Sequence, residues 1–400
     1  MIVNTLRPIL FSALVLGSSA SAWAEAAPLS ALEGALTGGT VNVNLRLRYE
    51  LVEQDNALED ADALTLRTAL GYTTQAWNGV SAFVEMENID ALVDDYSGVP
   101  PPTQFSVVAD PEGTEVNQWG VRYTGIKGLV ATLGRSKLIL DNARWVGNVG
   151  WRQNEQTYDG YFLKATPLAN VTLNGAYITN VNNIFFANVD LEGVLLNAQW
   201  VASPALALTA YGYLLDYNVI TPATPDADTV GLRATGGLPL GETVKLSYVA
   251  EFARQEATTA GGDFEADYLL GELALGIKGV SLAVGYEVLG SDGGSYAVMT
   301  PLATLHAHNG WNDLFLVTPA AGLNDLYVRL SGNLGKTAWM AKFHEFSADE
   351  GNADYGTEFN IQLTRPLVGK LSGGLKYGAY SADTLAVDTD KFWTWLGYAF

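Results

Sequence analysis

The chain has 400 residues, of which 48% are apolar and 42 are glycine, and its 43 acidic against 22 basic residues give a formal charge of −21. The absence of cysteine excludes a disulfide framework, a thiolate nucleophile and a cysteine-bound metal. The acidic balance argues against nucleic-acid binding, which needs clustered lysine and arginine. Beyond the N-terminal region there is no apolar run of about 18 residues, the length of a spanning helix. An apolar chain of this kind is typical of alternating strands in a membrane.

The N-terminal region predicts a secretory signal. Arg7 supplies its basic part, residues 9–16 its apolar part, and residues 22–24 a small-x-small cleavage site. We expect cleavage after Ala24, a short periplasmic lead-in over residues 25–40, and a single domain over residues 41–400.

From residue 41 onward the sequence alternates between apolar and polar residues. Val41, Val43 and Leu45 share one face of the first predicted strand, whereas Asn42 and Asn44 share the other. The same pattern predicts eighteen strands, at 41–52, 63–75, 79–91, 116–124, 129–136, 157–165, 169–179, 190–201, 205–216, 227–237, 242–254, 263–276, 279–289, 324–334, 336–347, 353–364, 369–381 and 389–400.

The connections between these strands differ in length in a regular way. Joins from odd to even strands are mostly long and polar, such as 53–62, 92–115, 137–156 and 290–323. Joins from even to odd strands are mostly tight and carry Gly, Pro or Asn, as at 76–78 and 366–368. Long loops on one side and short turns on the other are typical of an outer-membrane barrel. We therefore predict an all-β fold: a transmembrane antiparallel up-and-down β-barrel of about 18 strands.

The last ten residues favour the same fold. Phe392, Leu396, Tyr398 and Phe400 fall on one face of the final predicted strand. In a barrel this strand must close against the first, because an open edge is not tolerated in hydrocarbon. The aromatic C-terminus resembles the signature that the assembly machinery of outer-membrane barrels reads, so Phe400 is a predicted assembly signal. The alternative is a buried terminal strand of a soluble β-domain.

Strand alternation also divides the charged residues between lipid and lumen. The predicted pore-lining residues are Arg46, Arg48, Glu50, Arg67, Glu85, Glu87, Arg122, Lys164, Arg233, Lys245, Arg329 and Lys342, with Glu251, Glu272, Glu287, Glu358 and Lys376 on the same face. The lumen then has a modest basic excess, whereas the acidic residues gather in loops. Several tyrosines, including Tyr286, Tyr355 and Tyr398, are assigned to lipid. Such walls predict a water-filled pore; the alternative is that the charges solvate each other across a narrow or plugged interior.

Three connections have distinctive sequences, at residues 108–117, 134–156 and 300–313. Together with the barrel, they resemble the alginate export family of outer-membrane porins. The resemblance extends over nearly the whole mature chain and implies an eighteen-stranded barrel that moves a solute passively, with polyuronate secretion as the best-known role.

The cargo is a separate question, because a polyanion exporter needs fixed cations at its constriction. Arg135, Arg144 and Arg152 are a possible constriction loop that folds inward. Alternatively, Arg144 and Arg152 brace the loop against its own Asp141 and Glu155.

Other polar groups receive structural interpretations. His306 and His308 with Asp313 suggest hydrogen bonds that order a loop rather than a metal site. The acidic stretch with Asp110 and Glu112 is interpreted as a solvated loop rather than a calcium site. His344 and Ser347 face opposite sides, and no nucleophile motif appears. We expect no enzyme activity, no metal and no cofactor.

The sequence therefore predicts an outer-membrane porin of a Gram-negative bacterium, a passive aqueous channel for small hydrophilic or mildly anionic solutes. Its expected partners are outer-membrane lipids, the barrel-assembly machinery, and a small solute or a polyuronate. The alternatives are a secretion pore for an acidic polysaccharide such as alginate and a non-conducting surface or adhesion barrel.

Overall fold

A computed structural model describes residues 29–400. The predicted signal and cleavage site, and the first residues of the lead-in, lie outside the described residues. A single regular α-helix precedes the strands in this part of the chain, α2 (Leu29–Thr37). No helix within residues 29–400 has the length and apolar character needed to cross a membrane.

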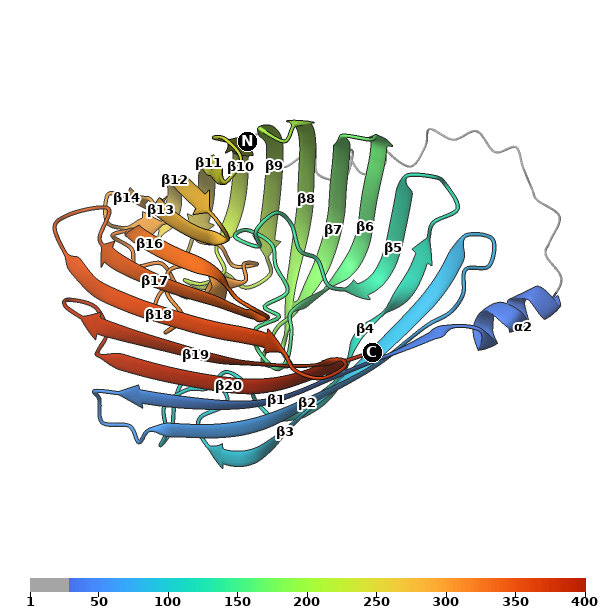
Figure 1. The fold of residues 1–400 in the computed structure, drawn as a ribbon, viewed down its shortest axis with the longest axis horizontal. Helices are drawn as coiled ribbons and strands as arrows, with labels where there is room; N and C mark the ends of the chain where they lie inside the picture. Colours follow the sequence, from blue (N-terminus) through green and yellow to red (C-terminus); the bar gives the residue numbers. More distant parts are fainter. Residues whose placement is uncertain (1–28) are drawn as a thin grey trace.

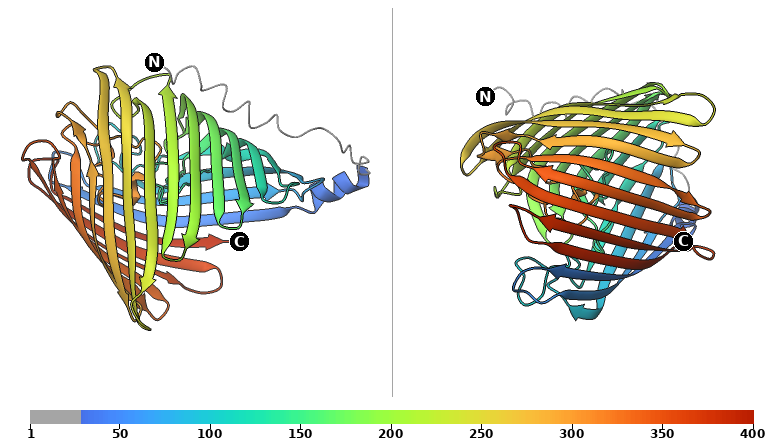
Figure 2. Two further views of the ribbon diagram at one scale, coloured as in Figure 1. Left: turned by 90° about the horizontal axis from the view of Figure 1, so that it is seen from above. Right: turned by 60° about the vertical axis from the view of Figure 1, so that its left-hand side comes forward.

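Eighteen antiparallel strands form one closed barrel (Figures 1 and 2). The barrel closes where β1 pairs with β20, and the ends of this pairing join Asn44 to Ala399 and Gln54 to Thr389. The strands are β1 (Thr40–Gln54), β2 (Ala61–Thr73), β3 (Val80–Asp95), β4 (Gly113–Tyr123), β5 (Leu129–Ser136), β6 (Thr157–Leu168), β7 (Val171–Asn182), β8 (Asn188–Ser203), β9 (Leu206–Tyr217), β10 (Asp226–Pro239), β11 (Val244–Thr259), β12 (Gly262–Ile277), β13 (Val280–Leu289), β16 (Leu323–Leu334), β17 (Thr337–Ser347), β18 (Asp354–Pro366), β19 (Leu371–Ala382) and β20 (Thr389–Ala399).

The alternation of the sequence becomes an inside and an outside of the barrel. On β13, Val284 and Tyr286 are each 47% exposed on the outer face, whereas Ala283 and Glu287 are buried on the inner face. The barrel therefore has an apolar outer belt and polar groups inside. Lipid solvates such an outer belt well, and water does not.

The predicted barrel is confirmed, with eighteen strands at the predicted places. Most boundaries agree closely, although β3 continues to Asp95 rather than 91 and β11 to Thr259 rather than 254. Tight turns join the even strands to the odd ones. At Asn78 and Gly79, with φ of 51° and 81°, both residues adopt the left-handed conformation that a two-residue hairpin turn requires.

The assignment of Tyr355 to lipid is wrong. Tyr355 is buried, and its hydroxyl donates to the carbonyl oxygen of Gly322 at 3.1 Å inside the barrel. The register of β17 and β18 shifts between Phe346 and Ser347, opposite Gly356 with φ of 123°. This bulge turns Tyr355 inward because an extra residue reverses the alternation.

Three long connections fold into the barrel, and we call them inner loops A (residues 96–112), B (137–156) and C (290–322) (Figure 1). Loop C contains the short hairpin β14 (Ser291–Asp292) and β15 (Tyr296–Ala297) and the 3-10 turn η1 (Leu305–Ala307). Loops B and C are joined by backbone hydrogen bonds, from Gly147 to Leu302 at 2.8 Å and from Thr304 to Ala143 at 3.0 Å. Apolar residues of both loops pack with one side of the wall in a buried cluster, so the loops form an internal partition.

The tight turn after β2 also holds the N-terminal segment. The amide of Gln75 donates to the carbonyl oxygen of Ala35 at 3.0 Å, and the Tyr72 hydroxyl donates to that of Leu36 at 2.6 Å. Helix α2 is thereby docked at the end of the barrel that carries the tight turns.

Candidate functional site: a constriction formed by three inner loops

The site begins with two arginines that the barrel register places side by side. Arg46 of β1 is the direct cross-strand partner of Arg67 of β2. Two neighbouring cations need acceptors, and loop B supplies them. Arg46 donates to Gln153 Oε1 at 2.8 Å and to the carbonyl oxygen of Gly150 at 2.9 Å, and Arg67 donates to Glu155 at 2.8 Å. The tip of loop B is therefore held against the β1–β2 wall.

Arg48, one step further along β1, binds loops A and B together. Its guanidinium donates to the Asp110 carboxylate of loop A and to the backbone carbonyl of Trp151 in loop B, and it lies 5.0 Å from the Trp151 ring. The second oxygen of Asp110 accepts a hydrogen bond from the Gln153 amide at 2.7 Å. The interpretation of this acidic stretch as a solvated loop is thus wrong for Asp110, which is fully buried as the counter-charge of Arg48.

Arg152, at the tip of loop B, joins the wall to loop C. It donates to Glu50 of β1 at 3.1 Å and to Asp313 of loop C at 2.6 Å. Burial alone would lower the pKa of Arg152, but these two carboxylates hold it above the usual value. A permanently charged guanidinium therefore connects β1, loop B and loop C.

The suggestion that Arg144 and Arg152 brace loop B against Asp141 and Glu155 is wrong. Arg144 lies 3.0 Å from Glu287 on β13, on the opposite side of the lumen. Asp141 instead accepts from Asn197 at 2.7 Å, and Glu155 from Lys137 at 2.5 Å. Both arginines cross to the wall, so loop B is held at both sides of the barrel.

Arg135 does not belong to this loop. It lies in β5 and forms a two-pronged pair with Asp159 of β6, with both N–O distances at 2.8 Å. The strand continues through Arg135 because Leu133 and Arg135 keep their cross-strand pairing with β4 and β6. The prediction that Arg135 lies in a constriction loop is therefore wrong: Arg135 braces two neighbouring strands.

Loop C contributes a buried histidine. His306 Nδ1 lies 2.7 Å from Asp313 Oδ1, in line with the expected loop-ordering hydrogen bond, and its Nε2 lies 2.5 Å from Lys376 Nζ of β19. The imidazole is stacked on Trp151 with centroids 4.8 Å apart. Burial lowers the pKa of His306 to about 3, so it is neutral near pH 7. A second buried histidine, His344 of β17, has a similar partner: its Nδ1 lies 2.8 Å from Asp325 of β16.

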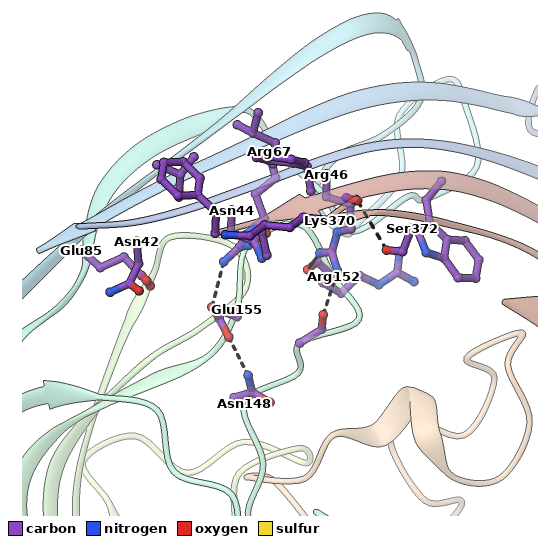
Figure 3. Close-up of a pocket in the computed structure, with 18 of the residues that line it drawn as sticks. Asn42, Asn44, Arg46, Arg67, Glu85, Asn148, Arg152, Glu155, Lys370 and Ser372 are labelled. Atoms are coloured by element: carbon purple, nitrogen blue, oxygen red, sulfur yellow. Dashed lines mark hydrogen bonds and ion pairs between the residues drawn. The ribbon is translucent and has the colours of Figure 1, made fainter. Parts of the chain in front are cut away.

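Beside this assembly lies a cavity of about 680 Å³ between the tip of loop B and the β1–β20 closure (Figure 3). Its charged lining comes from β1, β2, β3, loop B and the turn before β19, and consists of Arg46, Arg67, Lys137, Arg152 and Lys370 against Glu85 and Glu155. Figure 3 shows Glu155 between Arg67 and Asn148, with dashed contacts on both sides. The cavity is polar and carries both signs of charge, with more cations than anions.

The other predicted lining residues lie apart from the constriction. Arg233 pairs with Glu251, Arg329 with Glu272 at 2.8 Å, and Glu87 with Arg67 at 2.6 Å. Arg122 lies over the Phe83 ring and Lys342 over the Tyr327 ring, at 5.0 and 3.8 Å. Lys164 and Lys245 line two further cavities, of about 240 and 550 Å³. The predicted set is therefore spread around the wall. Its members on β1 and β2 meet the tip of loop B, and Glu85, Glu251, Glu287, Glu358 and Lys376 contact the inner loops from other strands.

Four charged residues at the site were not singled out from the sequence as site residues. Asp110 lies in a stretch with the acidic composition of a solvated loop, and Lys137 and Lys370 lie next to the ends of predicted strands. Lys391 of β20, 3.7 Å from Asp313, has the same strand parity as the buried Trp393 and could have been found by that signal. The contacts of Asp110, Lys137 and Lys370 depend on how the loops fold back, and the local sequence pattern does not predict that path.

The architecture matches solved outer-membrane porins. Pseudomonas aeruginosa OccK9 (OpdG) aligns with a TM-score of 0.72 at 14% identity, over 92% of this chain and 99% of that chain. Pseudomonas aeruginosa OpdK, solved with vanillate, aligns with a TM-score of 0.72 at 12% identity, over 92% and 100%. Acinetobacter baumannii OccAB4 aligns with a TM-score of 0.70 at 13% identity, over 90% and 98%. No protein-family model and no curated protein matches the sequence.

These matches establish the fold of this chain as the eighteen-stranded barrel of an outer-membrane porin. They do not single out the alginate export family that the sequence resembles.

Proposed function

We propose that this protein is an outer-membrane porin that lets small hydrophilic or mildly anionic solutes diffuse passively through its lumen. The observation that carries the proposal is the constriction itself. A closed barrel with an apolar outer belt surrounds three inner loops, and beside them lies a polar cavity of about 680 Å³ lined by Arg46, Arg67 and Lys370. Lumenal charges at such a narrowing select solutes by charge and size.

The size and charge of the cavity support a small solute rather than a polymer. Arg48, Arg152 and Arg144 are each paired with a buried carboxylate, from Asp110, Glu50 and Glu287. A guanidinium that already holds a carboxylate in the protein has little capacity left for a passing uronate. The partition by loops B and C also reduces the lumen available to a chain. These features argue against secretion of an acidic polysaccharide.

The test is single-channel recording of the purified, refolded barrel in planar bilayers, with reversal potentials measured in a salt gradient. We expect discrete conductance steps, and blockage by small carboxylates at millimolar concentration but not by a polyuronate applied from the side of the tight turns. A barrel that inserts without any conductance would contradict the proposal and favour a non-conducting surface protein.

A further inference from the structure

The lumen contains a buried lysine that faces a histidine. Lys376 Nζ lies 2.5 Å from His306 Nε2, 3.8 Å from the Trp311 ring and 4.1 Å from the Trp151 ring. An ammonium group has no acceptor, so the contact requires a lone pair on Nε2. The hydrogen of His306 then resides on Nδ1, which donates to Asp313 at 2.7 Å. The tryptophan rings around Nζ favour the ammonium form of Lys376. With that form, the contact selects a neutral His306 that carries its hydrogen on Nδ1.

This chain of contacts is where loops B and C are fastened to β19. His306 and Asp313 belong to loop C, Lys376 belongs to β19, and Trp151 of loop B stacks on the imidazole with an angle of 2° between the rings. Arg152 of loop B reaches the same Asp313 at 2.6 Å. Residues 305–313 of loop C are therefore held in the lumen partly through His306 and Lys376, beside the hydrogen bonds that Glu358 of β18 accepts from the amides of Trp311 and Asn312.

The charged groups that surround His306 come from every neighbouring element. Besides Lys376 on β19, they are Asp313 on loop C, Arg152 on loop B, Lys391 on β20, and Arg48 with Glu50 on β1. Asp313 is already shared by Arg152, His306 and Lys391. A proton on His306 would place a second cation in contact with Lys376 in a buried site.

We propose that the His306–Lys376 contact is an acid-released latch: protonation of His306 breaks the contact and lets residues 305–313 leave the constriction, which widens the channel. This inference rests on the proposed function only for its conductance readout, since the release itself is a property of the loop.

The direction of the pH dependence follows from the environment of His306 in the latched and in the released state of loop C. In the latched state burial lowers the pKa of His306 to about 3, whereas a released, solvated histidine titrates near its ordinary value of about 6.5. The latched state thus binds fewer protons. Its full stability is present above about pH 6.5, and the ratio of latched to released loop falls about tenfold for each pH unit from there down to about pH 3.

The first experiment measures channel conductance and open-state noise from pH 7 to pH 3 for the wild type, His306→Gln and Lys376→Met. Glutamine accepts a hydrogen bond but does not titrate, and methionine fits between tryptophan rings without a charge. We expect the wild type to gain conductance steeply as pH falls. His306→Gln should lose that steep component, whatever level it adopts at pH 7, and retain only the shallow response of other acids. Lys376→Met removes the cation that a protonated His306 would meet and should make the response shallower than in the wild type.

A cross-link isolates loop movement from other effects of acid. A Cβ added at Gly378 of β19 lies 3.4 Å from Asn312 Cγ of loop C, within reach of a disulfide, and the chain has no other cysteine. The oxidised Asn312→Cys/Gly378→Cys pair should show no steep acid response until a reductant restores it. The reduced form of the same double variant is the control, because Gly378→Cys alone would place its Cβ 2.5 Å from Asn312 Oδ1.

Tryptophan emission gives a readout that does not need conduction. Release of loop C exposes Trp311 and Trp151, so emission should shift to longer wavelength at acid pH in the wild type and not in His306→Gln. If both proteins have the same pH profile in emission and conductance, the latch is refuted. If the wild type never conducts but the emission difference is present, the channel proposal fails and the latch stands.

Discussion

At the scale of single residues, the constriction is assembled by arginines that each bind a buried carboxylate from a different element. Arg48 joins β1 to Asp110 of loop A, and Arg152 joins loop B to Glu50 and Asp313. Removal of one member of such a buried pair leaves the other charge uncompensated, which costs more than loss of a surface pair. Positions of the inner loops should therefore depend on a few guanidinium groups.

We predict that Arg152→Gln weakens docking of loop B by about 3 kcal/mol, or roughly a hundredfold in the docked population, because Glu50 and Asp313 lose their shared partner. Single-channel noise and protease cleavage within residues 137–156 should both increase. Arg254→Gln is the matched control: its ion pairs with Glu265 and Asp267 are half exposed, and neither readout should change. Equal behaviour of the two variants would contradict this account.

At the scale of elements, the two ends of the barrel have different kinds of connections between strands. Tight turns carry left-handed residues such as Asn78 and Gly79, whereas the longest connections fold back into the lumen. The closure of β20 on β1 depends on the last residue, since Phe400 and Val43 exchange backbone hydrogen bonds of 2.8 and 2.9 Å. The Phe400 side chain remains 53% exposed on the outer face, accessible to an assembly factor.

We predict that deletion of Phe400, or Phe400→Asp, lowers the amount of heat-resistant folded barrel in the outer membrane. The deletion removes two closing hydrogen bonds and the aromatic ring, and the aspartate places a charge in the outer apolar belt. Phe400→Tyr keeps the ring and should assemble normally. Unchanged heat-modifiable gel mobility for the aspartate variant would remove the proposed role of this residue.

The topology of the loops predicts a labelling pattern on whole cells. Single cysteines at Asp55 and Ser295, both exposed beyond strand ends, should react with an impermeant maleimide. A cysteine at Asn309 in the same connection as Ser295 should be protected, because Asn309 is buried against Glu287 at 2.8 Å. Cysteines at Asn78 or Pro366 should not react; if they label and Asp55 does not, the barrel is inserted the other way round.

At the scale of the whole molecule, the formal charge of −21 and the charge of the constriction have opposite signs. The acidic residues gather at one mouth, where Glu53, Asp55, Asp60, Asp388 and Asp390 line a surface cavity of about 590 Å³. Exposed charges beyond about 8 Å are screened at physiological salt. Charges at the narrow part act at shorter range and in less water, so they should dominate conduction.

We predict weak anion preference in moderate salt that drifts toward cation preference as salt is lowered and the field of the mouth extends. Lys370→Gln, at the cavity but outside the loop contacts, should shift reversal potentials toward cations at every salt concentration. Asp55→Asn with Asp60→Asn should remove the drift and leave the moderate-salt value unchanged. Strong cation preference of the wild type in moderate salt would contradict the dominance of the constriction.

The amino-acid sequence by itself determined the barrel, because alternation with period two and turn residues are local properties that each strand carries alone. It also assigned Arg46, Arg48 and Glu50 to one face of β1. The tertiary structure decided what those residues contact. Asp110 became a buried counter-charge and Arg135 a strand brace, and His306 met Lys376 across 70 positions of the chain. Loops have no repeating pattern to predict their path, so contacts between them and a distant wall are set by the closed barrel that confines them.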